Sequence, residues 1–262
     1  MTAARAGRRV LRIPLVLIHL LAGSLVALLV LRPGPGRIIS PRPMAIWSRL
    51  LCWILGVRIA VTGSPNPGST LFVANHISWL DIFCIATVCP THFLAKREVA
   101  QWPALGWLSR RVGTAFIDRG GGNGAGEAAA QIIWRLQQGG RMLIFPEGTS
   151  TTGESVRKFY PRLFQTGIHA HCPVQAIALR YPGSQGLNAA IPFVGDDSFI
   201  AHLWRLLGET SILAELHFHP PLATVGSSRN TLAAQTHRQI SETLNGQSAS
   251  VQWQPIASAA LN

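Results

Sequence analysis

The sequence predicts an α/β fold in which a central, mostly parallel or mixed sheet is covered by helices and preceded by an N-terminal helical anchor, transmembrane or interfacial. Beyond about residue 57, short apolar runs alternate with stretches of helical periodicity, which is typical of a sheet with helices on both faces. The chain before that point is apolar and basic. The length of 262 residues suits one domain with its own core.

The spacing of apolar residues predicts the individual elements. Six apolar runs predict strands at residues 57–62, 70–74, 112–117, 141–145, 174–180 and 211–218. Helical spacing predicts helices at residues 79–88, 99–110, 126–138 and 229–244. Gly139 and Gly140 follow the third of these helices and form a common helix stop. Residues 246–262 are expected to be a polar, poorly ordered tail.

The positive charge is concentrated at the N-terminal end. The net charge is +12, but no Asp or Glu precedes Asp81, and nine arginines stand before it. Residues 81–262 carry 14 Lys and Arg against 11 Asp and Glu, so they contribute only +3. Because the basic part is also the apolar part, we expect these arginines to bind anionic membrane lipids, and we expect no nucleic-acid partner.

A membrane helix is predicted at residues 13–31. These 19 residues carry no charged side chain, and as a helix they would extend roughly 28 Å, close to the thickness of a hydrocarbon core. The alternatives are a cleaved signal peptide and a helix that lies in the membrane surface or is buried. The stretch is long for a signal peptide, and Arg32-Pro33-Gly34 stands where small residues would be expected. Arginines flank both ends equally, so charge does not predict the orientation.

A Pro/Gly linker completes a first region, residues 1–43. Residues 44–57 then place apolar side chains at helical spacing, but the stretch is too short to span a bilayer readily, which predicts an interfacial helix. A core helix of the soluble domain is the alternative. Residues 44–245, including this helix, are expected to form the folded domain.

Cysteine and histidine usage predicts neither disulfides nor a bound metal. The four cysteines form no CxxC pair and lie in apolar surroundings, which suits a reducing, cytosol-facing domain. His169 with His171, and His217 with His219, each place two imidazoles on one strand face. Neither pair gains a carboxylate or a second cysteine at a usual spacing, so we expect no metal site.

The segment NHISWLD at residues 75–81 is the strongest indication of chemistry. His76 follows an apolar strand, and a His with a nearby carboxylate is a candidate general base. Residues five apart on one helix lie roughly 140° apart, so His76 and Asp81 can meet only if His76 precedes the helix and Asp81 lies near its start. That arrangement places the imidazole at the carboxyl end of a strand, where α/β sheets keep their sites. The alternative is structural, because Ser78 and Asp81 also fit a capping box.

Two further strands end in polar residues. The segment GTAFIDR ends in Arg119, whose guanidinium can bind a phosphate through two hydrogen bonds. The segment FPEGTS supplies Glu147 and the backbone amides of Gly148 and Thr149, which suit a polyol headgroup. The alternatives are a surface ion pair of Arg119 with Asp118 and an ordinary turn at residues 146–148.

With these segments in order, the sequence resembles the glycerolipid acyltransferase family, which includes the lysophosphatidic acid acyltransferases. The matching blocks are NHISWLD (75–81), GTAFIDR (113–119), FPEGTS (145–150) and CPVQAIAL (172–179), within a resemblance that covers about residues 70–182. Four blocks in the same order are far more specific than any one of them.

The resemblance implies a role for each matched residue. It implies that His76 and Asp81 are the catalytic dyad and that the following residues bind substrate: Lys96, Arg119, Glu147, Gly148, Thr149 and Pro173. Pro173 opens a strand that the resemblance places near the acyl site, and we expect all these strand ends to converge on one mouth. One departure is that Ser150 stands where many members have an arginine. A phosphate ligand is therefore missing or replaced by Arg157 or Lys158.

The resemblance also implies the reaction. We expect His76 to remove the proton from a lysophospholipid hydroxyl, which then attacks the thioester of acyl-CoA or of an acyl carrier protein without a cofactor. The favoured acceptor is 1-acyl-sn-glycerol-3-phosphate, which would give phosphatidic acid; a lyso-ornithine lipid or another lysolipid is the alternative. The rival from another class is a noncatalytic lipid-binding membrane protein. The expected location is the inner (cytoplasmic) membrane, with the catalytic domain facing the cytosol.

Overall fold

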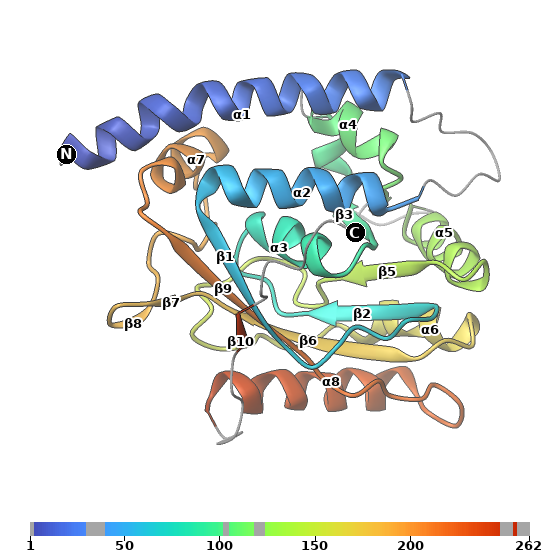
Figure 1. The fold of residues 1–262 in the computed structure, drawn as a ribbon. Helices are drawn as coiled ribbons and strands as arrows, with labels where there is room; N and C mark the ends of the chain where they lie inside the picture. The colour runs from blue at the N-terminus through green and yellow to red at the C-terminus, as the bar shows by residue number, and fades with distance from the viewer. Residues whose placement is uncertain (1–2, 30–39, 102–104, 118–123, 247–253, 256–262) are drawn as a thin grey trace.

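A mixed sheet of eight strands lies between two groups of helices (Figure 1). The computed structural model describes residues 3–29, 40–101, 105–117, 124–246 and 254–255. The strand order in the sheet is β10-β1-β9-β6-β2-β5-β3-β4. The predicted α/β fold with a mixed sheet covered by helices and an apolar N-terminal helix is confirmed.

The strands are short, as the sequence pattern indicates. Their bounds are β1 (Val57–Thr62), β2 (Thr70–Ala74), β3 (His92–Lys96), β4 (Ala115–Ile117), β5 (Arg141–Ile144), β6 (Val174–Arg180), β9 (Ile212–Phe218) and β10 (Gln254–Pro255), with a separate hairpin of β7 (Pro182–Gly183) and β8 (Gly186–Leu187). β6, β2, β5, β3 and β4 pair in parallel, whereas β9 is antiparallel to β6. The carboxyl ends of the five parallel strands therefore meet at one edge of the sheet.

The helices cover both faces of the sheet. Their bounds are α1 (Ala3–Leu29), α2 (Arg42–Leu55), α3 (Leu80–Val88), α4 (Leu105–Arg111), α5 (Gly124–Gln137), α6 (Phe164–His169), α7 (Phe199–Leu207) and α8 (Arg229–Leu244), with short 3-10 turns η1 (Arg97–Gln101) and η2 (Pro161–Leu163). α1, α2 and α3 lie above the sheet in Figure 1, and α8 lies below it.

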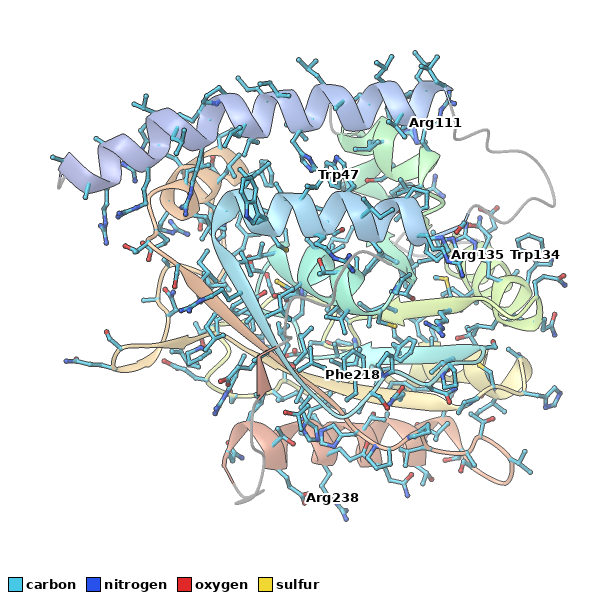
Figure 2. All side chains as sticks on the ribbon, viewed as in Figure 1. Trp47, Arg111, Trp134, Arg135, Phe218 and Arg238 are labelled. Atoms are coloured by element: carbon cyan, nitrogen blue, oxygen red, sulfur yellow. The ribbon has the colours of Figure 1, made fainter. Side chains whose placement is uncertain are left out.

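Alternation along each strand divides the core into two. Phe72 and Ala74 of β2 belong to a cluster with α2, α3 and α7, whereas Leu71 and Val73 belong to a cluster with α5, α6 and α8. Successive side chains of a strand point to opposite faces, so an unbroken apolar run is what a strand buried on both faces requires. The exposed Arg238 on α8 points away from the sheet, while Phe218 of β9 packs inside (Figure 2).

The four arginines that precede the apolar stretch contact the folded domain of the same chain. Nε of Arg8 donates to the carbonyl oxygen of Gly208, Nε of Arg9 donates to that of Trp204, and Nη1 of Arg12 donates to that of Glu209 at 2.6 Å. Arg5 forms an ion pair with the Glu209 side chain at 3.7 Å. Cations favour the carbonyls at a helix C-terminus, which is the end of α7 here. These four arginines therefore contact the domain itself, and their binding of anionic lipid stays a prediction.

These contacts explain why α1 begins at Ala3 and not near residue 13. The helix contacts α7, then α2 and α4, so it lies against the domain along its length (Figure 1). By length and composition it can still cross a membrane, with a mean hydropathy of 2.1 over its most apolar 18 residues. α2 combines the two alternatives considered for it, a core helix and an interfacial helix. One face packs on α3, while Ile46, Leu50 and Trp53 are exposed.

Other elements differ from the sequence expectation. The predicted helix at 99–110 overlaps two elements, η1 and α4, and residues 102–104 between them lie outside the described residues. β3 and α7 were not predicted, since each is too short to show a clear period. Residues 254–255 of the predicted tail form β10, antiparallel to β1.

The arginine contacts predict unequal effects on stability. Arg9 is 8% exposed, and its guanidinium lies 4.6 Å from the ring centroid of Trp204. We expect Arg9→Ala to lower the free energy of unfolding by roughly 1–3 kcal/mol, since it removes a charge-assisted hydrogen bond and a cation–π contact. Chemical denaturation measures this change. Arg5→Ala, which removes only an exposed ion pair, is the control and should have an effect below about 1 kcal/mol; equal losses would contradict the docking described.

Candidate active site

His76 and Asp81 meet at the carboxyl end of β2. The five residues of β2 are buried, the chain turns through residues 75–79, and Asp81 lies in the first turn of α3. Nδ1 of His76 lies 2.8 Å from Oδ2 of Asp81. The imidazole thus precedes the helix and the carboxylate lies inside it, as the five-residue spacing requires. Since a carboxylate accepts the hydrogen bond, Nδ1 is the donor, and in the neutral imidazole Nε2 then keeps its lone pair.

Asp81 is fully buried, and hydrogen bonds compensate its charge. Besides the imidazole, Oδ2 accepts from the backbone N–H groups of Ile77 at 2.7 Å and Ser78 at 2.9 Å. Oδ1 accepts from the hydroxyl of Tyr181 at 2.9 Å. The bond to Ser78 N–H is one half of the predicted capping box. The other half is not formed, because the N-cap of α3 is Trp79 and the Ser78 hydroxyl accepts from the N–H of Leu80 at 3.4 Å.

The third block, FPEGTS, and the residue after it bind the peptide groups of His76. The backbone N–H of His76 donates to Oε1 of Glu147 at 2.7 Å, and its carbonyl accepts from the N–H of Thr151 at 2.8 Å. The imidazole stacks on Phe145 with ring centroids 4.0 Å apart and an interplanar angle of 17°. The His76 side chain is 20% exposed. Its main chain is thus fixed while part of its ring is open to solvent.

The Glu147 carboxylate binds main-chain groups of the protein itself. Oε2 accepts from the backbone N–H of Arg157 at 2.8 Å, so both carboxylate oxygens bind main-chain donors. The side chain is 3% exposed, and burial raises the pKa of its carboxyl, with the two N–H donors acting in the opposite direction. This geometry gives Glu147 a positioning role, and direct contact with a headgroup stays a prediction.

The other residues predicted to bind substrate lie in different places. Lys96 ends β3 at the same edge as His76 and is exposed. Gly148, at φ +76°, forms the turn that follows β5, a conformation that favours glycine, and Thr149 is half-buried beside it. Arg119 lies outside the described residues, two positions after the end of β4 at this edge.

The expectation that Pro173 lies near His76 is wrong. It precedes β6, and Val174 pairs with Leu71 near the start of β2, so Pro173 lies at the edge of the sheet opposite to His76. Parallel strands bring their carboxyl ends together, and the site lies there. The residue before a strand therefore lies at the other edge of the sheet, away from the site. The carboxyl end of β6, with Leu179 and Tyr181, is what reaches the dyad.

Several residues that position the dyad were missed. The Asn75 side chain donates to the carbonyl of Leu179 and accepts from its N–H, both at 2.8 Å, which joins the ends of β2 and β6. The Ser150 hydroxyl donates to the carbonyl of Phe193, whose own N–H donates to the carbonyl of Ile77 at 3.0 Å. Asn75 could have been found from its place in the motif, whereas the partner of Ser150 is fixed by tertiary structure alone.

The dyad loop is also bound to α7. The indole N–H of Trp79 donates to Nδ1 of His202 at 3.0 Å, and Nε2 of His202 donates to the carbonyl of Ile191 at 2.9 Å. This pattern fixes a neutral tautomer, and burial lowers the pKa of His202. α7 therefore links the motif to the arginines of α1.

No group of three potential metal ligands occurs in the part of the chain that the structure describes. His217 and His219, at the end of β9, have ring centroids 4.4 Å apart, and Nε2 of His219 lies 3.2 Å from the hydroxyl of Thr243 on α8. Burial lowers the pKa of His219 to about 4. The absence of a metal site stays a prediction.

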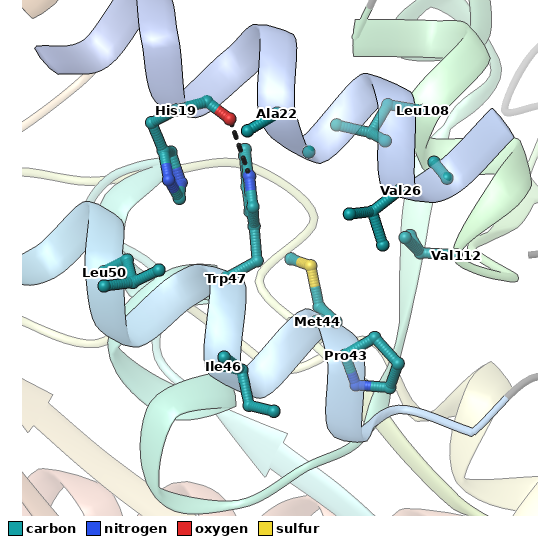
Figure 3. Close-up of a pocket in the computed structure, with 12 residues that line it drawn as sticks. His19, Ala22, Val26, Pro43, Met44, Ile46, Trp47, Leu50, Leu108 and Val112 are labelled. Carbon is teal, nitrogen blue, oxygen red and sulfur yellow. Dashed lines mark hydrogen bonds between the residues drawn. The ribbon is translucent and has the colours of Figure 1, made fainter. Parts of the chain in front are cut away.

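An apolar cavity of about 320 Å³ lies between α1, α2 and α4 (Figure 3). It is lined by α1 residues around Gly23 and by α2 residues including Met44 and Leu50. Trp47 forms part of the wall and stacks on His19, with ring centroids 4.5 Å apart. The cavity lies beside the exposed apolar face of α2, on the side of the molecule that carries α1.

Sequence comparison agrees with this geometry. The family model described as Acyltransferase matches residues 58–180. A lyso-ornithine lipid O-acyltransferase from Pseudomonas aeruginosa is 36% identical over 221 residues, which cover 83% of this chain and 85% of that protein. The chain belongs to the acyltransferase family.

Other relatives of this acyltransferase differ in their acceptors. A lyso-ornithine lipid O-acyltransferase from Rhodobacter capsulatus is 36% identical over 250 residues, covering 89% of this chain and 88% of the relative. A 1-acyl-sn-glycerol-3-phosphate acyltransferase from Neisseria gonorrhoeae is 33% identical over 164 residues, covering 63% and 64%. The crystal structure of the 1-acyl-sn-glycerophosphate acyltransferase from Thermotoga maritima is similar in fold, with a TM-score of 0.60, 21% identity and coverage of 82% and 81%.

Proposed function

We propose that this acyltransferase moves an acyl group from a thioester to the free hydroxyl of a lysolipid, with His76 as general base. The observation that carries the proposal is the hydrogen bond between His76 and the buried Asp81, which leaves Nε2 of a partly exposed imidazole as the base. A lipid-binding protein without catalysis would not need this arrangement, and the family membership speaks against that alternative.

The proposed mechanism is a direct transfer. Nε2 of His76 takes the proton of the acceptor hydroxyl as its oxygen attacks the thioester carbonyl, and Asp81 stabilises the imidazolium that forms. The tetrahedral intermediate collapses with loss of the thiolate, which takes up the proton from His76. An acyl-enzyme is not needed, and neither is a metal or cofactor, because a thiolate leaves readily. The donor is acyl-CoA or an acylated carrier protein.

For the acceptor, we propose a lyso-ornithine lipid, although the resemblance by itself favours 1-acyl-sn-glycerol-3-phosphate. Two sequence relatives at 36% identity, matched over 85% and 88% of their length, are named for lyso-ornithine lipid, whereas the Neisseria gonorrhoeae relative named for the phosphate-bearing acceptor is 33% identical and matched over 64% of its length. Ser150 supplies no cation, and its hydroxyl is bound to the carbonyl of Phe193. Arg157 is exposed, and its backbone N–H donates to Glu147. Its guanidinium is therefore one candidate ligand for the phosphate of a phosphate-bearing acceptor.

The apolar side of the molecule supports membrane attachment. Leu21 and Leu25 of α1 are 72% and 55% exposed, and Trp53 is 71% exposed on α2, the helix that borders the cavity together with α1. Because α1 lies along the domain, we propose that this face enters the bilayer surface and holds the site near its lipid substrates. We place the enzyme at the inner membrane with its catalytic domain in the cytosol, where the thioester donors occur and the four cysteines stay reduced.

The dyad is tested by His76→Ala. We expect acyl transfer to fall by ~10²–10⁴-fold, because the variant lacks the group that takes the hydroxyl proton. Transfer of a radiolabelled acyl group by the purified enzyme measures the change, and circular dichroism checks the fold. His169→Ala, at an exposed histidine on α6, is the matched control and should transfer at the wild-type rate. A folded His76→Ala protein that keeps near wild-type activity would rule out the mechanism.

Arg119→Ala separates the acceptors. Loss of a charge-assisted contact costs roughly 2–4 kcal/mol, so the KM for a phosphate-bearing acceptor should rise ~30- to 1,000-fold, while the donor KM changes little. With a lyso-ornithine lipid the effect should be smaller, because that acceptor lacks the phosphate. Steady-state kinetics with both substrates varied independently measures each KM, with Arg229→Ala on α8 as control. Equal changes in both KM values, or none, would show that Arg119 is not the headgroup ligand.

Membrane attachment is tested by a charged pair on α1. Leu21→Glu with Leu25→Glu should weaken binding to phospholipid vesicles without a loss of thermal stability, since both side chains are exposed on the face proposed to enter the bilayer. Cosedimentation measures the bound fraction. Val225→Glu, at a residue that is 85% exposed before α8, should bind like the wild type. Unchanged binding by the double variant would overturn the proposed membrane face.

A further inference from the structure

Tyr181 is a buried hydroxyl beside the dyad that the mechanism above does not use. It is 2% exposed and follows directly after β6. Its hydroxyl donates to Oδ1 of Asp81 at 2.9 Å, and the sulfur of Cys84 lies 3.6 Å away. The first contact has the geometry of a strong hydrogen bond to a carboxylate, and the second is a weak one.

The sheet holds Tyr181 in this place. The side chain of Asn75 binds both backbone groups of Leu179, and Tyr181 stands two residues further along the same chain. The carbonyl of Tyr181 accepts from the N–H of Asn188 at 2.8 Å, which fixes the next turn. Burial and the nearby Asp81 charge raise the pKa of Tyr181 well above its usual value, so the phenol stays protonated and acts as a donor.

We propose that Tyr181 is a positioning residue that orients the Asp81 carboxylate and sets how strongly it holds the imidazole proton. The proposal rests on the general-base role of His76. It adds a third member to the dyad. Tyr181 follows β6, whereas His76 and Asp81 both belong to the segment at residues 75–81.

The division of donors over the carboxylate supports this role. Oδ2 accepts from His76, Ile77 and Ser78, whereas Tyr181 is the donor recorded on Oδ1 among the described residues. A donor on Oδ1 stabilises the negative charge and reduces its attraction for the imidazole proton. It also prevents rotation of the carboxylate, because the two oxygens then have different partners.

The surrounding titratable groups do not supply this effect. The Glu147 carboxyl, from the turn after β5, binds the backbone of His76. The thiols of Cys84 on α3 and Cys52 on α2 are buried and hydrogen-bonded to each other, and burial raises the pKa of Cys84. His202 on α7 reaches the loop only through Trp79. Tyr181 is thus the described titratable side chain, apart from His76, that hydrogen-bonds Asp81.

Tyr181→Phe removes the hydroxyl and keeps the ring. We expect kcat to fall by about tenfold with little change in either KM. We also expect the acidic limb of the plot of kcat/KM against pH to move to higher pH by about 0.5–1 unit, because the Asp81 carboxylate then holds the imidazole proton more strongly. A residue that only packs would not move this limb. The chain has two tyrosines, and Tyr160→Phe, at the exposed one, is the matched control.

Fluorotyrosine tests the same hydrogen bond without removing it. In a Tyr160→Phe background, biosynthetic incorporation of 3-fluorotyrosine labels Tyr181 alone. The fluorinated phenol is more acidic and a stronger donor, so the acidic limb should move to lower pH, opposite to Tyr181→Phe. This arm stays informative if Tyr181→Phe does not fold. Cys84→Ala should leave the limb in place; a shift there equal to that of Tyr181→Phe would assign the effect to the thiol.

The outcomes separate this proposal from the general-base mechanism. Limb shifts of opposite sign in the two tyrosine variants support the role of Tyr181. If His76→Ala is inactive while neither tyrosine change moves the limb, the role of Tyr181 is overturned and the general base stands. If His76→Ala keeps its activity, the general base itself fails.

Discussion

The structure of the site depends on the burial of one negative charge. Asp81 has no exposed surface, and an isolated carboxylate in such a place would be strongly unfavourable. Four donors compensate it: two backbone N–H groups of its own loop, the imidazole of His76 and the hydroxyl of Tyr181. Each donor restricts the loop between β2 and α3, so the interactions that make the charge tolerable also hold the imidazole in place.

The parallel part of the sheet supplies the remaining support. β2 delivers the dyad loop, β5 delivers Glu147 and Phe145, and β6 delivers Leu179 and Tyr181, all at one edge. On the dyad side, His202 connects the loop to α7, and the arginines of α1 bind the end of that helix. The apolar helix α1 and the dyad are therefore parts of one packed unit. With the membrane attachment proposed above, this packing would hold the site both rigid and close to the bilayer.

Local pattern was enough to predict β2, β6 and α8 with the bounds that the structure has, because each shows a clear period or an unbroken apolar run. The His76–Asp81 contact was also predictable, since five residues and a strand end determine it. The position of Pro173, the partners of the N-terminal arginines and the role of Tyr181 were not, because each depends on pairing between segments about 100 or more residues apart. Arg119, which the resemblance favours as a ligand, lies outside the described residues.

The central claim is that Asp81 selects the tautomer of His76 that leaves Nε2 free to accept a proton. Nitrogen-15 NMR of the histidine-labelled enzyme at neutral pH, assigned by comparison with His76→Ala, reports this directly. For the neutral form of the ring we predict the proton on Nδ1 and an Nε2 resonance typical of an unprotonated nitrogen. A His76 ring with the proton on Nε2 would contradict it, because that nitrogen could not then act as the base.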